Sequence, residues 1–128
     1  MKIPTIENPV HLFNVHLDLT QRSREKQIQK IINRARSHVP DRCPLILAGD
    51  FNDWSRQASK PLHESLLLKD AAKNYHGEYS KSFPSFMPVL TLDRIYYRTF
   101  NVLKVLTWDH HPWPSLSDHL PLYAELEL

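Results

Sequence analysis

The chain has 128 residues, a length typical of one domain with a single hydrophobic core. Hydrophobic residues make up 41% and charged residues 23%, which excludes the composition of a disordered chain. The formal net charge of +2 is too small to indicate a nucleic-acid-binding protein by itself. Cys43 is the only cysteine, which excludes an internal disulfide and a cysteine-based zinc site, and we expect a cytoplasmic protein. No apolar run has the length of a signal peptide or a transmembrane helix.

The predicted elements begin with a strand and a long helix. Residues 10–19 are apolar and rich in β-forming side chains, which predicts a strand. Thr20 or Ser23 is the candidate N-cap of the helix, and Pro40 ends it. The apolar side chains between them recur at helical spacing, at Ile28, Ile31, Ile32, Ala35 and Val39. Most other positions of this helix are basic, and a solvated outer face is the simplest interpretation.

A second strand follows and leads to a group of candidate site residues. Residues 45–48 form a continuous apolar run, typical of a strand buried on both faces, and Asp50 and Asn52 come soon after it. Residues 62–68 predict a short helix, and residues 73–88 a polar loop rich in proline and aromatic side chains. The remaining patterns predict three strands, at residues 89–97, 102–107 and 121–128.

Acidic, amide and imidazole side chains occur near the predicted strand ends, where open α/β sheets build their sites. Each has a structural alternative: His16 can be a hydrogen-bonded strand residue, Asp50 and Asn52 can form a turn, and Asp93 can pair with Arg94. The full set of candidates is His16, Asp50 with Asn52, Asp93, and Asp118 with His119.

Phosphodiester hydrolysis gives these residue types a joint function. A carboxylate orients or deprotonates water, amide and imidazole donors stabilise charge on phosphate oxygens, and a metal held by carboxylates neutralises the remaining charge. Asp50, Asn52, His16 and His119 fit these functions. Asp93 can hold an imidazole in one tautomer and raise its pKa.

Short motifs also occur in a fixed order along the chain. They are Asn14-Val15-His16-Leu17, Arg24 with Gln27, Leu47-Ala48-Gly49-Asp50-Phe51-Asn52-Asp53-Trp54, Phe83-Pro84, Leu92-Asp93-Arg94-Ile95-Tyr96-Tyr97 and Leu116-Ser117-Asp118-His119-Leu120-Pro121. This order resembles the C-terminal half of the endonuclease/exonuclease/phosphatase family, over about residues 10–128. Small uncharacterised bacterial members resemble the chain most, because they share the Asp53-Trp54 extension and the Phe83-Pro84 loop.

The resemblance implies a role for each catalytic candidate. Asp50 would position or activate the attacking water, and Asn52 would hydrogen-bond the scissile phosphate. His16 would donate to a phosphate oxygen or to the leaving group. Asp93 and His119 would form a dyad in which His119 faces the phosphate.

The resemblance also implies metal and substrate contacts. Asp118 would contact Mg²⁺ or Mn²⁺, directly or through water. Arg24, Asn52 and Trp54 would contact a phosphate-containing substrate.

Two further groups of side chains have more than one possible function. The basic side chains Arg22, Arg24, Arg56, Lys60 and Arg94 can track a phosphate backbone or simply face solvent. Trp108, His110, His111 and Trp113 can stack on a base, contact a lipid headgroup or form a hydrophobic lid.

The family fold is a four-layer α/β/β/α sandwich, of which this chain would be one half. The fold class expected is therefore α/β (α+β), with one mainly antiparallel sheet and helices on one face. Residues 10–128 would form this half and residues 1–9 an N-terminal extension. The N-terminal half, with its metal-binding glutamate, is absent from this sequence, and Glu7-Asn8 is not expected to replace it.

A half-sandwich exposes the inner face of its sheet, so we expect a homodimer. A partner supplying the N-terminal half and a truncated fragment are the alternatives. The predicted function is a Mg²⁺-dependent phosphodiesterase or phosphoesterase, acting on nucleic acid or on a small phosphoester and weakened by the missing glutamate. The alternative function is a non-catalytic, dimerising half-domain.

Overall fold

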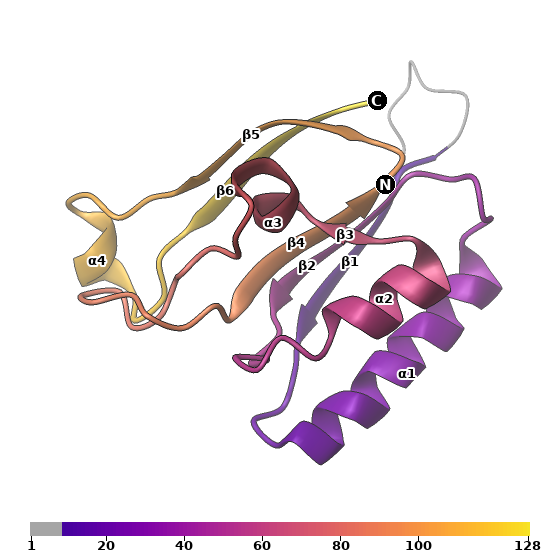
Figure 1. Ribbon diagram of the computed structural model, residues 1–128, viewed down its shortest axis with the longest axis horizontal. Helices are drawn as coiled ribbons and strands as arrows, with labels where there is room; N and C mark the ends of the chain where they lie inside the picture. Colours follow the sequence, from indigo (N-terminus) through magenta and orange to yellow (C-terminus); the bar gives the residue numbers. More distant parts are fainter. Residues whose placement is uncertain (1–8) are drawn as a thin grey trace.

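The computed structural model describes residues 9–128, and Figure 1 shows its architecture. The elements are β1 (His11–His16), α1 (Gln21–His38), β2 (Leu45–Asp50), α2 (Ser59–Leu66), β3 (Lys69–Asp70), α3 (Ala71–His76), β4 (Asp93–Arg98), β5 (Asn101–Thr107), α4 (Trp113–Leu116) and β6 (Leu122–Glu127). Glu7 and Asn8 lie outside the described residues, so the extension over residues 1–9 stays a prediction. No helix within residues 9–128 is both long and apolar enough to cross a membrane.

The strands form a mixed arrangement in which antiparallel pairing dominates. A four-stranded sheet has the order β1-β2-β4-β3, and β5 and β6 form a separate two-stranded sheet. The β1–β2 pair is parallel, whereas the β2–β4, β3–β4 and β5–β6 pairs are antiparallel. The predicted α/β fold with a mainly antiparallel sheet is therefore confirmed, although its strands divide between two sheets.

Strand register brings three candidate site residues to one end of the larger sheet. His16 is aligned with Asp50 across β1 and β2, and Asp50 is aligned with Asp93 across β2 and β4. His16 and Asp50 are the last residues of parallel strands, and Asp93 is the first residue of an antiparallel one. All three therefore reach the same sheet edge from separate segments of the chain.

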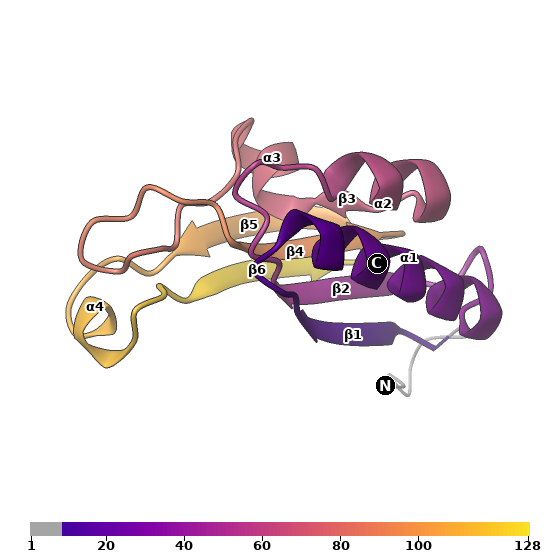
Figure 2. The ribbon, with the colours of Figure 1, turned by 90° about the horizontal axis from the view of Figure 1, so that it is seen from below.

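Helix α1 packs on one face of the larger sheet, as its apolar spacing predicts. The Thr20 side chain accepts a hydrogen bond from the Ser23 amide at 3.3 Å and caps the helix. Ile28, Ile32 and Ala35 are buried in the main core, which also contains residues of β2, β4 and α2. Figure 2 shows α1 and α2 on the same side of the strands, so the predicted covering of one sheet face by helices is confirmed.

Two local predictions are wrong. Strand β2 is not buried on both faces: Leu45 and Leu47 lie under the helices, but Ile46 and Ala48 are only half-buried because no helix covers that side. The predicted loop over residues 73–88 begins with α3, whose N-cap Asp70 accepts from the Lys73 amide at 2.8 Å. This helix is short enough that its apolar periodicity is hidden in the sequence.

Gly49 allows β1 and β2 to approach each other beside the site. Its φ of +143° is a backbone conformation that other residues rarely adopt. A Cβ atom at this position would lie 1.9 Å from the Val15 carbonyl oxygen, which is backbone and cannot rotate away. The glycine between Ala48 and Asp50 is therefore a packing requirement of the fold.

We predict that Gly49→Ala destabilises the protein severely, because both the clash and the backbone conformation oppose a side chain. The free energy of unfolding should fall by at least about 4 kcal/mol, measured by urea denaturation. Gly77→Ala is the matched control: φ is +84° but no atom lies within 4 Å of the added Cβ. Its cost should be about 1 to 2 kcal/mol. Equal losses in the two variants would contradict the steric explanation.

Candidate active site

A cleft of about 610 Å³ opens at the sheet edge where the candidate residues meet. The end of β1, the turn after β2 and the loops before β4 and β6 supply its walls. Its lining residues are His16, Leu17, Asp18, Leu19, Asp50, Asn52, Trp54, Phe83, Leu90, Leu92 and His119. The structure thus brings five of the predicted side chains to one cleft: His16, Asp50, Asn52, Trp54 and His119.

Asp50 lies between two imidazoles. Its Oδ2 atom is 3.6 Å from His16 Nε2 and 3.7 Å from His119 Nε2. These separations exceed a hydrogen bond, so Oδ2 keeps acceptor capacity toward the cleft. Its Oδ1 atom accepts the Asn52 backbone amide at 2.9 Å, which fixes the carboxylate within the turn that follows β2. Asp50 and Asn52 therefore do form the turn that was the structural alternative for them. The same turn orients the Asp50 carboxylate beside two imidazoles.

Asp93 and His119 form the predicted dyad. His119 Nδ1 lies 2.6 Å from Asp93 Oδ2, and the Ser82 hydroxyl donates to the same oxygen at 2.5 Å. The alternative ion pair between Asp93 and Arg94 is wrong, because neighbouring residues of β4 point to opposite faces of the sheet. Arg94 pairs with Asp53 at 2.8 Å instead.

The pKa of His119 is raised above its ordinary value. Burial alone would lower this pKa, but the hydrogen bond and negative charge of Asp93 act in the opposite direction and outweigh it. The charges of Asp50 and Asp118 add to the increase. The imidazolium form, which can donate to an anionic oxygen from Nε2, is therefore stabilised.

Asn52 occupies the cleft wall in a constrained conformation. Its φ is +47°, and its side-chain amide donates to the Leu17 carbonyl oxygen at 2.6 Å. This bond ties the turn after β2 to the end of β1. One amide hydrogen is thereby used within the chain, which leaves one more for a ligand.

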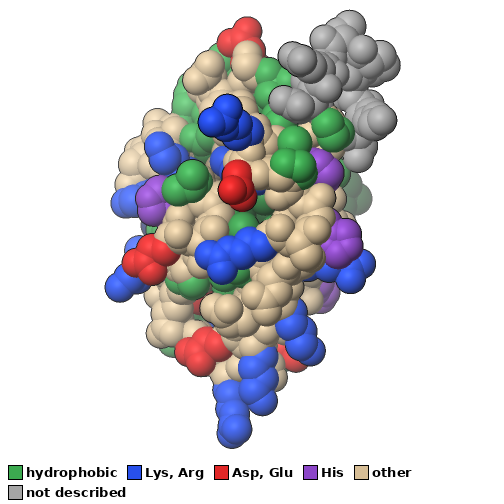
Figure 3. Space-filling view, turned by 90° about the vertical axis from the view of Figure 1, so that its right-hand side faces the viewer, with side chains coloured by type: hydrophobic (Ala, Val, Ile, Leu, Met, Phe, Trp, Pro, Cys, Tyr) green, Lys and Arg blue, Asp and Glu red, His purple; other side chains and the backbone are tan. Residues whose placement is uncertain are grey.

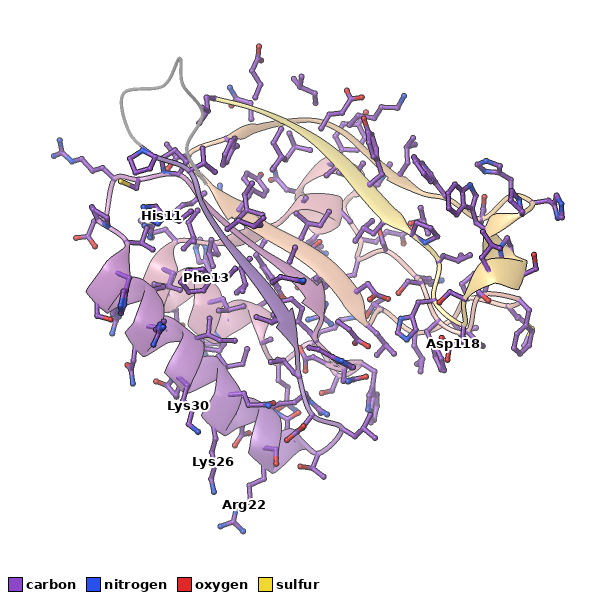
Figure 4. The ribbon with its side chains drawn as sticks, turned by 180° about the vertical axis from the view of Figure 1, so that it is seen from behind. His11, Phe13, Arg22, Lys26, Lys30 and Asp118 are labelled. Atoms are coloured by element: carbon purple, nitrogen blue, oxygen red, sulfur yellow. The ribbon has the colours of Figure 1, made fainter. Side chains whose placement is uncertain are left out.

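The remaining predicted residues have different environments. Trp54 is 61% exposed at the cleft. Asp118 is exposed in the loop just before β6 (Figure 4) and does not line the cleft. Arg24 is only 4% exposed, and its guanidinium donates to the carbonyl oxygens of Asp18 and Leu19 at 3.3 and 2.5 Å. Arg24 therefore shapes the cleft wall through the chain that connects β1 to α1.

The basic side chains form no single patch at the cleft. Arg22, Lys26 and Lys30 project from α1 away from the sheet (Figure 4), and basic groups are scattered over the side of the molecule shown in Figure 3. The solvent-facing alternative for Arg24 and Arg94 is wrong, because both are buried, and the substrate contact of Arg24 stays a prediction. Their burial could not be predicted from the sequence, because no local pattern distinguishes a buried arginine from an exposed one.

Two residues that contact the Asp93–His119 dyad were not assigned a function from the sequence. Ser82 is fully buried and donates to Asp93, and the ring of Phe83 lies 4.9 Å from the His119 ring. Phe83 belongs to the Phe83-Pro84 motif and Ser82 directly precedes it, so the motif was the available sequence signal for both residues. Ser85, which follows, donates to the Pro114 and Ser117 carbonyl oxygens at 2.8 and 2.6 Å. It joins this loop to the loop that carries His119.

The aromatic residues near the C-terminus form a cluster of their own outside the cleft lining. Trp108 stacks on Tyr123 with ring centroids 5.5 Å apart, and Trp113 lies 5.0 Å from Trp108. His110 and His111 are exposed.

One group of side chains within the described residues could hold a metal ion. Ligand atoms of Asp50, Asp93 and His119 lie within 4.8 Å of one another. Carboxylate oxygens suit Mg²⁺ and Mn²⁺, although the dyad hydrogen bond already occupies Asp93 Oδ2 and His119 Nδ1. Within this group, the Oδ2 atom of Asp50 is the carboxylate oxygen that is free of a hydrogen bond, and Asp118 lies outside the group.

Parallel and antiparallel strands bring carboxylates and imidazoles together at a cleft on one sheet edge, which is where α/β proteins usually carry their sites. The model of the Endonuclease/Exonuclease/phosphatase family matches residues 2–119. The chain belongs to this family, and the resemblance inferred from the motifs is confirmed.

The chain also resembles curated relatives in sequence and solved structures in fold. The chain is 34% identical over 125 residues to the uncharacterized protein YbhP of Escherichia coli K12, covering 98% of this chain and 49% of YbhP. A functionally unknown protein from Enterococcus faecalis V583 has a TM-score of 0.77 at 24% identity, covering 96% of this chain and 52% of that one. Mannosyl-6-phosphatase Bt3783 of Bacteroides thetaiotaomicron has a TM-score of 0.73 at 21% identity, covering 91% and 51%. The chain spans about half the length of the curated relatives it matches.

We predict that Asp93→Asn lowers the pKa of His119, because it removes the charge that opposes the effect of burial. Since the folded-state pKa lies above the unfolded value, the dyad stabilises the fold below the unfolded pKa. That contribution is lost as pH rises through the folded pKa. An NMR titration of the His119 ring in metal-free protein measures the change, with the exposed Asp109→Asn as control. An unchanged or higher pKa in Asp93→Asn would contradict the assignment.

Proposed function

We propose that this chain carries the acid–base part of a phosphoesterase site that hydrolyses a phosphodiester or related phosphoester with a divalent cation. The observation that supports it most directly is the position of Asp50 Oδ2 between His16 Nε2 and His119 Nε2, at 3.6 and 3.7 Å. A carboxylate and two imidazoles around one small volume combine a proton acceptor with two potential donors. This is the combination that water attack on a phosphate ester requires.

Each side chain has a defined task in this proposal. Asp50 orients the attacking water and accepts its proton, because its Oδ2 faces the cleft without a hydrogen bond. His119, held by Asp93, donates from Nε2 to a phosphate oxygen. His16 has a side chain that is 78% exposed and can donate to a second oxygen or to the leaving group. Asn52 uses its remaining amide hydrogen to hold the phosphate.

Asp118 would contact the cation, Mg²⁺ or Mn²⁺, directly or through water. A bound cation of this type supplies charge neutralisation for the phosphate oxygens. With few protein ligands in this chain, binding is expected to be weak, since Mg²⁺ retains much of its water shell. Further ligands would come from a second polypeptide segment that completes the site.

In this proposal, the side chains at the entrance of the cleft determine which substrate binds. Trp54 presents an exposed indole beside Asp50 and Asn52, which suits stacking against a base, a sugar or another flat leaving group. One structural neighbour is named a mannosyl-6-phosphatase, so a protein with this fold is described as acting on a small sugar phosphate. The proposed substrates are therefore nucleic acid or a small phosphoester.

The uncovered sheet face supports a second proposal, that another polypeptide layer packs on it. Leu12 is 50% exposed, and Ile46, Ala48 and Ile95 are only half-buried on the side opposite α1. Apolar sheet faces usually pack against another layer. A homodimer is the arrangement we propose, with a partner chain as the alternative. If the site proves inactive, this surface would make the chain a non-catalytic dimerising half-domain.

We predict that the purified chain hydrolyses bis-p-nitrophenyl phosphate slowly in Mn²⁺ or Mg²⁺, and that Asp50→Asn reduces kcat on the order of 100-fold or more. His119→Ala should have a similar effect, whereas Asp109→Asn should leave kcat unchanged. Thermal unfolding of each variant shows whether the fold is intact. Absence of metal-dependent hydrolysis, or full activity in Asp50→Asn, would contradict the proposed function.

We predict a dimer in sedimentation velocity that Leu12→Glu converts to a monomer, because a buried charge would face the partner sheet. Leu116→Glu, at a side chain that is 66% exposed on α4, is the matched control and should remain dimeric. A monomeric wild-type chain across the concentration range would exclude the homodimer.

A further inference from the structure

A buried ion pair lies on the opposite side of the sheet from the cleft. Arg94 and Asp53 are 1% and 2% exposed, and Arg94 Nη1 lies 2.8 Å from Asp53 Oδ2. Arg94 directly follows the dyad residue Asp93 in β4, and Asp53 directly follows Asn52. Each partner of this pair is therefore the chain neighbour of a residue in the proposed site.

The guanidinium joins two segments through several contacts. Arg94 Nη2 donates to the backbone carbonyl of Asp53 and, at 3.0 Å, to that of Thr91. Nη1 also donates to the Tyr96 hydroxyl at 3.1 Å. The turn after β2 and the segment that enters β4 are thus connected by one rigid, planar group.

Asp53 extends the connection into α2. Its Oδ1 atom accepts the Gln57 amide at 3.0 Å, and its Oδ2 atom accepts the Ala58 amide at 2.8 Å, just before α2 begins. Asn52 and Arg56, on either side of Asp53, both have positive φ values, 47° and 64°. Such a turn needs outside restraints to keep one conformation.

Tyr79 and Tyr96 shield the pair from water. The Arg94 guanidinium carbon lies 4.8 Å from the centre of the Tyr79 ring, and the Ser59 hydroxyl contacts the hydroxyls of both tyrosines at 2.7 Å. Burial raises the pKa of Tyr96 to about 12, so this hydroxyl remains neutral. The charges of Arg94 and Asp53 therefore interact in a protected environment.

We propose that the Arg94–Asp53 pair is a positioning clamp that holds Asn52 and Trp54 in register with Asp93 and His119. Buried ion pairs often contribute little net stability compared with apolar replacements, so stability alone is a weak reason for this pair. Its contacts instead restrain the turn that presents Asp50, Asn52 and Trp54. Arg94 acts through that turn and touches no reacting atom. This inference rests on the proposed function only for its kinetic consequence.

Arg94→Lys is the test variant, because lysine keeps the positive charge but cannot bridge two carbonyl groups and a carboxylate with one planar group. Arg98→Lys is the matched control. Arg98 lies on the same face of β4, is 9% exposed and donates to the Cys43, Leu66 and Pro40 carbonyl oxygens at the opposite end of the strand. Both variants remove bridging contacts from β4, but only Arg94→Lys removes contacts to the turn that carries Asn52 and Trp54.

Two measurements are made on both variants. ¹⁵N relaxation dispersion should show new microsecond-to-millisecond exchange at the Asn52 and Trp54 amides in Arg94→Lys and none there in Arg98→Lys. Hydrolysis of bis-p-nitrophenyl phosphate should fall on the order of 100-fold in kcat for Arg94→Lys, with KM changing less, because misplacement of catalytic groups acts mainly on the transition state. Arg98→Lys should stay within about threefold of wild type in kcat.

The outcomes separate the clamp from the proposed function. Exchange at Asn52 and Trp54 in Arg94→Lys, in a protein without hydrolytic activity, would support the clamp and contradict the proposed function. Unchanged amide dynamics in Arg94→Lys would overturn the clamp, whatever the activity. Equal losses of activity and order in Arg94→Lys and Arg98→Lys would overturn it too, because the effect would then belong to the fold in general.

Discussion

The alignment of His16, Asp50 and Asp93 across three neighbouring strands is the constraint on which the site depends. It requires β1 and β2 to run parallel and β4 to run antiparallel to β2, so that two strand ends and one strand beginning share an edge. Gly49 permits the close approach of β1 and β2 directly beside this edge. A slip of one residue in either register would turn a site residue toward the helices. The positions of the proposed site residues therefore depend on how the strands pair.

The larger sheet separates two kinds of polar group. On the cleft side, Asp50 and Asp93 are partly solvated and lie beside the imidazoles of His16 and His119. On the helix side, Arg94 and Arg98 are buried, and their donors are used on carbonyl oxygens and on Asp53. Period-two alternation along β4 places these groups back to back. Asp50 and Asp93 are therefore backed, on the other face of the sheet, by a layer of buried polar contacts.

The sequence predicted the long helix, five of the six strands and the shared location of His16, Asp50, Asn52 and His119, because periodicity and motif order are local signals. It failed where an outcome depends on distant partners. Arg24 and Arg94 looked solvent-facing, and only the fold shows that carbonyl groups and Asp53 surround them. The burial of Ile46 depends on a layer that covers the sheet, and no pattern within the strand itself records that layer. Asp118 and its proposed metal contact stay a prediction.

The hydrogen bonds of Ser85 have a consequence for motion. They join the loop that carries Ser82 and Phe83 to the loop that carries His119, and Ser82 and His119 both contact Asp93. Two segments far apart in the chain therefore form one mechanical unit along a single wall of the cleft. A ligand that rests against Phe83 therefore bears on the same wall that holds the imidazole of His119.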